Sequence, residues 1–359
     1  MQDKKGKRRF SLLLGALAAV TAIAANGAYA PARTVRAEEA QPTEGYVHSV
    51  YTNELVPVAQ AALRPIAVMM PTDKIAQPSY GIGSAKVLYE IMEEGEISRQ
   101  MAIIDTWQGM QKIGNIRSCR LYYIPEATEW DPILIHFGGV FYMKEMITRP
   151  DINNLSGTSQ YGTGGGAPGS GAFYRTDDRK APHNAYISAT GIASAAGQLG
   201  YSLNVRPEYY KPQHFLFAEG VNTLAQYADA KQANTVDLSQ IFTYTKSAFT
   251  YNPSDGLYYK TLHGKAQTDG LTGQQLSFAN ILIQNTKWVN LDGKYLAFAN
   301  YDIEDGYFCT KGKAIHVNWV KSGDYEPTRY YDDFGNEIQL NTGKTYIAIA
   351  QKGRSPIFK

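Results

Sequence analysis

Cysteine is scarce in this chain: Cys119 and Cys309 are the two cysteines among 359 residues. Two thiols cannot supply a disulfide framework or a cysteine zinc site, which need more bridges or more ligands. They could pair with each other or lie apart as small buried hydrophobic residues, and the sequence leaves both arrangements open. No cysteine follows the N-terminal apolar run, so nothing there could accept a lipoprotein anchor.

Several enzyme motifs are also missing. The chain has no Gly-x-Ser-x-Gly elbow, no His-Glu-x-x-His pair and no Gly-x-x-x-x-Gly-Lys-Ser/Thr loop. These absences argue against the common forms of serine hydrolase, zinc protease and P-loop nucleotide site. We therefore expect neither a metal nor a cofactor.

The small positive net charge comes from the N-terminus. The chain has 35 basic and 33 acidic residues, and residues 1–30 hold five of the basic residues and one acidic residue, Asp3. Without that segment, 30 basic and 32 acidic residues remain, a net charge of −2. Charge therefore gives no argument for a nucleic-acid partner.

The same segment has the three parts of a secretory signal. Lys4, Lys5 and Lys7, with Arg8-Arg9, precede an uncharged apolar run over residues 10–25, and Ala28-Tyr29-Ala30 has the small-x-small pattern of a cleavage site. The alternative is a retained membrane anchor, but a span needs about 20 apolar residues. We expect residues 1–30 to be removed and the protein to be secreted or held in the cell envelope.

The rest of the chain changes character along its length. Residues 31–60 are polar and lack periodicity, which favours a linker. Strand and helix patterns alternate in the first half: strands are expected at 63–70, 97–105 and 132–137, and helices at 85–93, 119–128, 140–147 and 190–199. A loop with many glycines separates the last of these helices from the others, at 162–171.

The second half is rich in aromatic and β-branched residues and in turn dipeptides such as Asp255-Gly256 and Gly335-Asn336. Antiparallel strands are expected at 279–287, 295–300, 313–321 and 345–351. Together the two halves predict an α+β fold, with a mixed α/β domain at 61–232 and a mainly antiparallel β domain at 233–354.

Specific strings resemble a known family. In the first half they are Arg64-Pro65-Ile66-Ala67-Val68-Met69, Gly114-Asn115-Ile116-Arg117-Ser118-Cys119-Arg120, His136-Phe137-Gly138-Gly139 and Arg179-Lys180-Ala181-Pro182-His183-Asn184. In the second half they are Lys313-Ala314-Ile315-His316-Val317-Asn318-Trp319, Pro327-Thr328-Arg329-Tyr330-Tyr331 and Asn341-Thr342-Gly343-Lys344-Thr345. The chain resembles the YerB-like family of bacterial envelope proteins, which are named as lipoproteins and have no proven reaction.

The resemblance implies two sequence domains joined in one layered α+β sandwich, an envelope location and, in some members, a link to peptidoglycan-synthesis factors. This chain departs from the family in two respects. It lacks the lipobox cysteine, and it has Cys119 where a small apolar residue is usual, so a Cys119–Cys309 disulfide merits a test.

Polar residues of the first half suggest a shared ligand site. Arg117 and Arg120 could point to one side of a helix start, which would favour an anion. Glycines beside His136, at the end of a strand, could let backbone N–H groups approach a ligand. The expected ligand-binding residues are Arg117, Arg120, His136, Gly138, Gly139, Arg175, Arg179, His183 and Asn184, with Glu90, Glu94 and Arg99 in support. The alternative for each residue is a structural ion pair, a core histidine or a cap.

Three functions remain open at this point. The first is an exported accessory protein that binds an anionic cell-wall fragment or a wall-synthesis protein. The second is a hydrolase that uses Arg and His side chains on an envelope phosphodiester or glycan. The third is a docking module that uses aromatic residues of the β half, such as Trp288 and Trp319.

Overall fold

The computed structural model describes residues 44–158 and 170–359. The expected signal segment, the first part of the expected linker and most of the glycine-rich loop lie outside the described residues. The described residues belong to one compact unit. Residues 44–60, expected as part of the linker, form a β-hairpin and the start of a short helix, and Val56 of the hairpin is buried.

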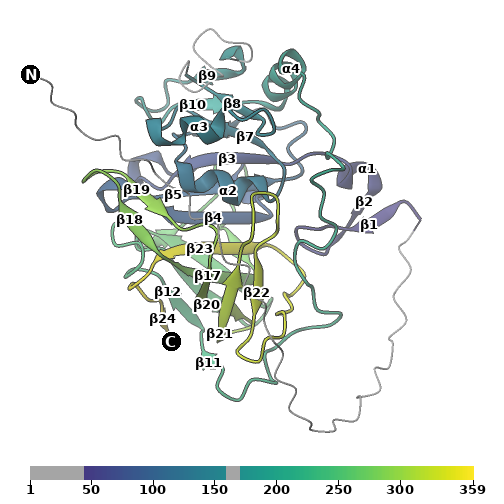
Figure 1. Cartoon of the computed structure of the whole chain (residues 1–359), viewed down its shortest axis with the longest axis vertical. Coiled ribbons are helices and arrows are strands. Elements are labelled where there is room, and N and C mark those ends of the chain that lie inside the picture. The colour runs from purple at the N-terminus through teal and green to yellow at the C-terminus, as the bar shows by residue number, and fades with distance from the viewer. Residues whose placement is uncertain (1–43, 159–169) are drawn as a thin grey trace, which may run out of the picture. The chain divides into compact units, whose positions relative to one another are not determined.

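One mixed sheet of 11 strands dominates the described residues (Figure 1). Its strands, in spatial order, are β11 (Lys231–Gln232), β21 (Lys313–Val320), β20 (Ile303–Thr310), β17 (Asn280–Thr286), β23 (Thr345–Gln351), β4 (Val87–Met92), β5 (Ser98–Ile104), β3 (Ile66–Pro71), β7 (Ile133–His136) and β8 (Asn154–Ser156), and β22 (Arg329–Tyr331) pairs with β21. Four of these pairings are parallel, β17 with β23, β23 with β4, β3 with β7 and β7 with β8.

Four smaller sheets complete the described strands. The six-stranded sheet contains β15 (Lys265–Ala266), β14 (Leu257–Leu262), β13 (Ala248–Asn252), β12 (Thr235–Asp237), β24 (Ile357–Phe358) and β16 (Ser277–Phe278). The others are β6 (Ile113–Gly114) with β10 (Ala185–Ile187) and β9 (Phe173–Arg175), β1 (Tyr46–His48) with β2 (Leu55–Pro57), and β18 (Trp288–Asn290) with β19 (Leu296–Phe298).

Helices are few and short in the described residues. They are α1 (Val58–Ala61), α2 (Ile124–Thr128), α3 (Lys144–Ile147) and α4 (Ala189–Leu199), with 3-10 turns at Lys74–Ala76, Ile82–Ser84, Glu94–Glu96, Leu121–Tyr123, Phe141–Met143 and Ser170–Ala172. Ser188 caps α4, since its side chain accepts a hydrogen bond from the Gly191 N–H, and Gly200 ends the helix in the left-handed region. The described chain is thus mainly β with some helices, in mixed and antiparallel sheets.

The helix expected at residues 85–93 is wrong, because this segment forms strand β4. All six residues of β4 are buried, so both faces of the strand must be apolar or internally paired. A buried strand with apolar residues on both faces lacks the alternation that marks a half-exposed strand. Its apolar run could therefore be mistaken for a helical face.

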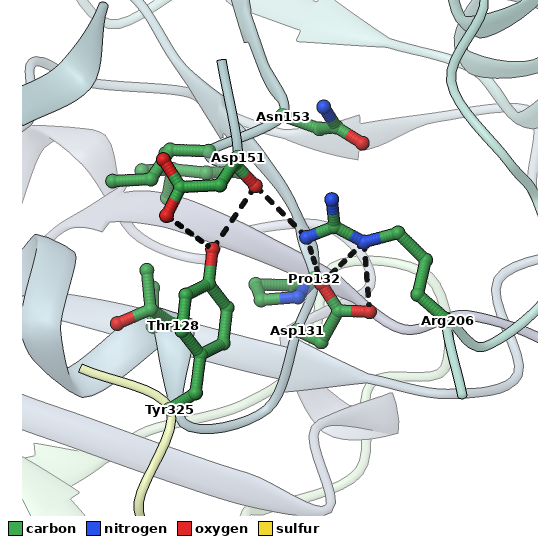
Figure 2. Close-up of a pocket in the computed structure, with 10 residues that line it drawn as sticks. Thr128, Asp131, Pro132, Asp151, Asn153, Arg206 and Tyr325 are labelled. Carbon is green, nitrogen blue, oxygen red and sulfur yellow. Dashed lines mark hydrogen bonds and ion pairs between the residues drawn. The ribbon is translucent and has the colours of Figure 1, made fainter. Parts of the chain in front are cut away.

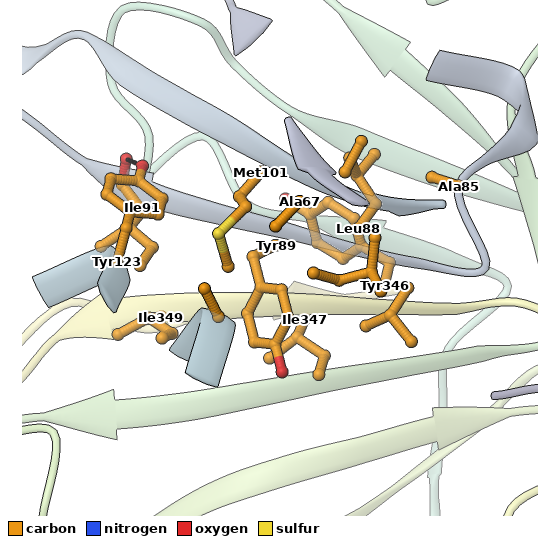
Figure 3. Close-up of a cluster of buried hydrophobic side chains, with 14 of the residues drawn as sticks. Ala67, Ala85, Leu88, Tyr89, Ile91, Met101, Tyr123, Tyr346, Ile347 and Ile349 are labelled. Carbon is orange, nitrogen blue, oxygen red and sulfur yellow. Dashed lines mark hydrogen bonds between the residues drawn. The ribbon is translucent and has the colours of Figure 1, made fainter. Parts of the chain in front are cut away.

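The two sequence halves share the central sheet. Strand β23, from the C-terminal end of the chain, lies beside β4, where Ile347 is opposite Tyr89 (Figure 1). Apolar side chains from both halves form one core there: Leu88 and Met101 lie near Tyr346 and Ile349 (Figure 3). Burial of this shared apolar surface joins the halves.

Candidate functional site

Two of the expected site arginines are neutralised by carboxylates at the turn between β4 and β5. Arg120 donates to Oε2 of Glu94 at 2.8 Å and to Oε1 at 3.0 Å, and its guanidinium lies 3.7 Å from Glu93. Arg99 lies 2.7 Å from the Glu93 carboxylate and also donates to the Ser118 carbonyl. All four charged side chains are largely buried. These are structural ion pairs, of the kind that Glu94 was expected to form.

Burial and the neighbouring charges have opposite effects on the pKa values in this network of ion pairs. Burial disfavours the charged form of Arg120, but the nearby carboxylates of Glu93 and Glu94 raise its pKa. Burial also raises the pKa of Glu93, although Arg99 and Arg120 oppose that change. The guanidinium groups are therefore held by resident anions, and a ligand would have to displace them.

The positive charge of Arg117 is compensated much less by nearby carboxylates than that of Arg120. Arg117 Nη1 lies 3.0 Å from Nδ1 of His183, and it forms an ion pair with Oδ2 of Asp73 at the longer distance of 3.8 Å. Because a guanidinium can only donate, His183 Nδ1 accepts, which assigns the ring proton to Nε2. Burial and the neighbouring Arg117 charge lower the pKa of His183, so the neutral ring is the favoured form.

The β9–β10 hairpin adds two more guanidinium groups that are held by neutral acceptors. Arg179 donates to the carbonyls of Ala76 and Pro78, at 2.6 and 2.7 Å. Arg175 donates to Asn184 Oδ1 at 2.6 Å and lies 4.6 Å from the centre of the Phe137 ring. Neither arginine forms an ion pair among the described residues.

We call Arg117, Arg175, Arg179 and His183 the Arg117 patch. The charges of Arg117 and Arg179 both act on the His183 ring, and Arg175 is joined to Asn184, the next residue along the chain. Within the described residues, Nε2 of His183 has no hydrogen-bond partner and the ring is only half-buried. The patch therefore combines positive charge with an N–H group that a ligand can reach.

Other expected site residues have structural roles. His136 is fully buried, its Nδ1 lies 2.8 Å from the Gly138 carbonyl, and its Nε2 lies 3.2 Å from Asn154 Oδ1. Burial lowers the pKa of His136. A side chain at Gly139 would collide with Met143, so this glycine permits close packing. His136 and the glycine pair are thus core elements and do not face a ligand.

The expectation that Glu90 supports the arginines is wrong, and the arrangement of the two cysteines, which the sequence left open, is decided by the structure. Glu90 does not pair with the arginines, because its buried carboxylate lies 3.1 Å from Lys260 Nζ, in the second half of the chain. Cys119 and Cys309 are both free and buried, so the structure contains no disulfide between them. Sequence separation gave no information about either arrangement, which depends on how the sheets pack.

Sequence reasoning also missed two carboxylates of this region, Asp73 and Glu93. Glu93 stands directly before Glu94 in the sequence. Two adjacent acidic residues could have indicated that nearby arginines, here Arg99 and Arg120, would be neutralised. Asp73 lies far from Arg117 in sequence, and no local pattern connects them.

A small pocket lies where Asp131, Arg206 and Tyr325 meet (Figure 2). Asp131 accepts hydrogen bonds from Arg206 and, at 2.9 Å, from buried Arg64, and Tyr325 donates to the Asp151 carbonyl at 3.0 Å. Its volume of about 10 Å³ is roughly that of one water site. Since its polar groups are paired with one another, the pocket joins chain segments and does not offer a ligand site.

A second buried cluster lies next to this pocket. Glu129 accepts hydrogen bonds from Lys321 Nζ at 2.8 Å, from the Thr328 N–H at 2.9 Å and from the Tyr89 hydroxyl. Despite burial, Lys321 and His214 lower the pKa of Glu129. Burial raises the pKa of Glu126 to about 7, with the Glu129 charge adding to the effect and Lys321 opposing it. Both carboxyl groups are enclosed, so they act on stability.

The two tryptophans expected for a docking module differ in exposure. Trp319 is only 2% exposed, and its indole N–H donates to the Asn285 carbonyl, so it belongs to the core. Trp288, in β18, is 40% exposed. Only the second of these tryptophans is therefore available to a partner.

The described residues define a mainly β protein with structural ion pairs and one undercompensated basic patch. Within residues 44–158 and 170–359, no group of three or more His, Cys, Asp or Glu side chains is arranged to hold a metal. None of the helices in the described part of the chain is long and apolar enough to cross a membrane.

Comparison with known proteins gives the family. Residues 51–202 match "Protein of unknown function (DUF3048) N-terminal domain", and residues 237–347 match the corresponding C-terminal domain. "Putative lipoprotein YerB" of Bacillus subtilis (strain 168) is 28% identical over 297 residues, which cover 80% of this chain and 81% of that protein. The chain belongs to the YerB-like family, as the sequence strings indicated.

A solved structure shares the fold. The crystal structure of YerB protein from Bacillus subtilis has a TM-score of 0.72 to this chain at 23% sequence identity. The match covers 85% of this chain and 96% of that chain. The arrangement of strands described above is therefore the fold of that protein as well.

Proposed function

We propose that this protein is an exported accessory protein of the cell envelope that binds an anionic cell-wall fragment at the Arg117 patch. Two observations support the location: the N-terminal residues have the pattern of a secretory signal, and the relative from Bacillus subtilis is named a lipoprotein. The family is described as one of unknown function, so the activity rests on this chain's own residues.

The observation that carries the binding proposal is the contrast between Arg117 and its neighbours. Arg120 has two carboxylate oxygens within 3.0 Å, whereas Arg117 has a neutral histidine nitrogen at 3.0 Å and a carboxylate at 3.8 Å. A partly buried guanidinium without a close anion is unfavourable. A ligand carboxylate or phosphate would supply that anion and accept a second hydrogen bond from His183 Nε2.

A hydrolase is less well supported by the same geometry. Burial raises the pKa of the Cys119 thiol to about 12, so it is a poor nucleophile at neutral pH. His183 already uses Nδ1 to accept from Arg117, which leaves Nε2 protonated and unable to act as a base. We therefore favour binding over turnover.

The test is titration of the protein with purified muropeptides, followed by calorimetry, with mass spectrometry of the mixture to detect cleavage. We expect binding without cleavage, and Arg117→Ala should weaken it by roughly tenfold or more. Arg354→Ala is the matched control, because Arg354 already has a bidentate contact with Glu96. Equal affinities of parent and Arg117→Ala, or no binding by the parent, would refute the proposal, and cleavage would favour the hydrolase.

A further inference from the structure

A second cleft lies between the end of the first half and the C-terminal half and shares no residue with the Arg117 patch. Its volume is about 300 Å³, at the lower end of the range for ligand sites. It lies between the segment 222–227 and the turn 332–339. The lining residues are Asn222, Gln226, Tyr227, Asp332, Phe334, Asn336, Glu337 and Gln339.

Hydrogen bonds fix both walls of the cleft. The Asp332 carboxylate accepts from the backbone N–H groups of Phe334 and Asn336, at 2.9 and 2.8 Å, which shapes the turn. The same carboxylate accepts from the Tyr227 hydroxyl of the opposite wall at 3.0 Å. Asn222 Nδ2 donates to the Gln339 carbonyl at 2.6 Å, which joins the walls a second time. The cleft is therefore preformed, and a ligand need not order it.

The rim of the cleft carries an aromatic side chain that the fold does not use. Phe334 is 83% exposed at the tip of the turn. An exposed phenyl ring contributes nothing to the core, and it gives a flat apolar face to whatever enters the cleft. Gln339 lines the same cleft, is exposed, and its amide has no hydrogen-bond partner among the described residues. An amide offers both donors and an acceptor.

The charges of the lining residues narrow the class of ligand. Asp332 accepts hydrogen bonds from the turn and from Tyr227, and the charge of Glu337 is compensated by Arg329 at 3.0 Å, so both carboxylates already have partners. No Lys or Arg is among the described lining residues, so nothing there attracts an anion. A neutral ligand with many hydroxyl groups fits best, because hydroxyls both donate to and accept from amides.

We infer that this cleft binds a short neutral oligosaccharide, with one sugar ring stacked on Phe334 and its hydroxyl groups bonded to the amide of Gln339. The C–H face of a sugar ring is apolar, so it can cover the phenyl ring while the hydroxyl edge stays bonded. This site is separate from the one proposed for anions.

The experiment is titration of the full chain with two neutral probes, an N-acetylglucosamine tetramer and a maltose-series tetramer, followed by calorimetry and by NMR of the Phe334 region. We expect at least one probe to bind, and Phe334→Ala to weaken that binding about tenfold or more. Phe334→Ala should not change the melting temperature, since the ring is exposed. Phe141→Ala, which removes another exposed ring, is the matched control.

Arg117→Ala should leave this binding unchanged, so the two proposals can fail separately. Absence of binding by both probes at millimolar concentration would overturn the inference. The same holds if Phe334→Ala binds as well as the parent, or if a carboxylated oligosaccharide binds more tightly than the neutral ones.

Discussion

Lys260 Nζ lies 3.1 Å from the Glu90 carboxylate, and both side chains are completely buried. Glu90 is in β4 of the first half, and Lys260 is in β14 of the second half. Glu90 also accepts hydrogen bonds from Ser98, Ser247 and Tyr346, so its carboxylate is the centre of a polar group inside the protein. Burial raises the pKa of Glu90 less than these partners lower it.

Lys260→Met should destabilise the protein by about 3–5 kcal/mol, because it leaves an uncompensated buried carboxylate. The double variant Glu90→Gln with Lys260→Met should recover much of that loss, since no buried charge remains. Urea denaturation followed by circular dichroism would measure both changes. Lys265→Met, on an exposed position, is the control. A loss of less than about 1 kcal/mol for Lys260→Met would show that the pair matters little.

The fragment of residues 60–232 should not fold by itself. In the whole chain, β4 pairs with β23, which lies more than a hundred residues beyond the end of that fragment. The fragment would expose the edge of β4 and one side of its core. We expect aggregation or a broad melt in calorimetry. A sharp, cooperative transition would contradict the shared core.

Arg120→Ala and Arg117→Ala should differ in their effects on stability. Arg120 makes three hydrogen bonds to Glu94, and hydrogen bonds to charged groups contribute about 1.5–3 kcal/mol each. Its removal should therefore lower the melting temperature clearly, while Arg117→Ala should change it less. Equal losses in the two variants would mean that Arg117 is also a structural residue.

Stability should fall as Glu126 ionises. The pKa of Glu126 is raised from 4.5 to about 7, because burial disfavours its charged form first of all. The folded protein thus binds this proton more tightly than the unfolded chain does. The resulting stabilisation is present below about pH 4.5 and is lost as the pH rises through 7.

The variant Glu126→Gln keeps a side-chain oxygen that can accept the hydrogen bond from Asn300 Nδ2, but the new side chain cannot ionise. Denaturation curves measured across this pH range should therefore show a smaller decline for Glu126→Gln than for the parent. Glu129, whose pKa is lowered, acts in the opposite direction at acidic pH and is present in both proteins. Parallel pH profiles of the two proteins would rule out this role for Glu126.

Both thiols should be unreactive in the native protein. Burial raises the pKa of Cys119 to about 12 and that of Cys309 further, so little thiolate forms at neutral pH. A thiol reagent should label both cysteines of the denatured protein and almost no cysteine of the native protein. Absence of labelling in denaturant without reductant would indicate a disulfide instead.

Local patterns in the sequence determined much of the secondary structure. The apolar runs near Ile66, Ile133 and Thr345 and the alternating segment near Lys313 form strands, because period and residue type act within a few neighbours. The strings spread over both halves, from Arg64 to Thr345, also indicated the family. The expected convergence of Arg117 and His183 is present in the structure, where they lie 3.0 Å apart.

Only the tertiary structure decided which polar side chains are free and which are paired within the fold. Glu90 and Lys260 lie in different halves of the chain, and only sheet packing could show that they neutralise each other. The same holds for His136, whose nitrogens are taken by Gly138 and Asn154. Strand patterns depend on neighbouring residues, so the strands and the family could be predicted from the sequence. Charge pairing and burial depend on distances between remote segments. The cleft beside Phe334 could therefore be found only in the tertiary structure.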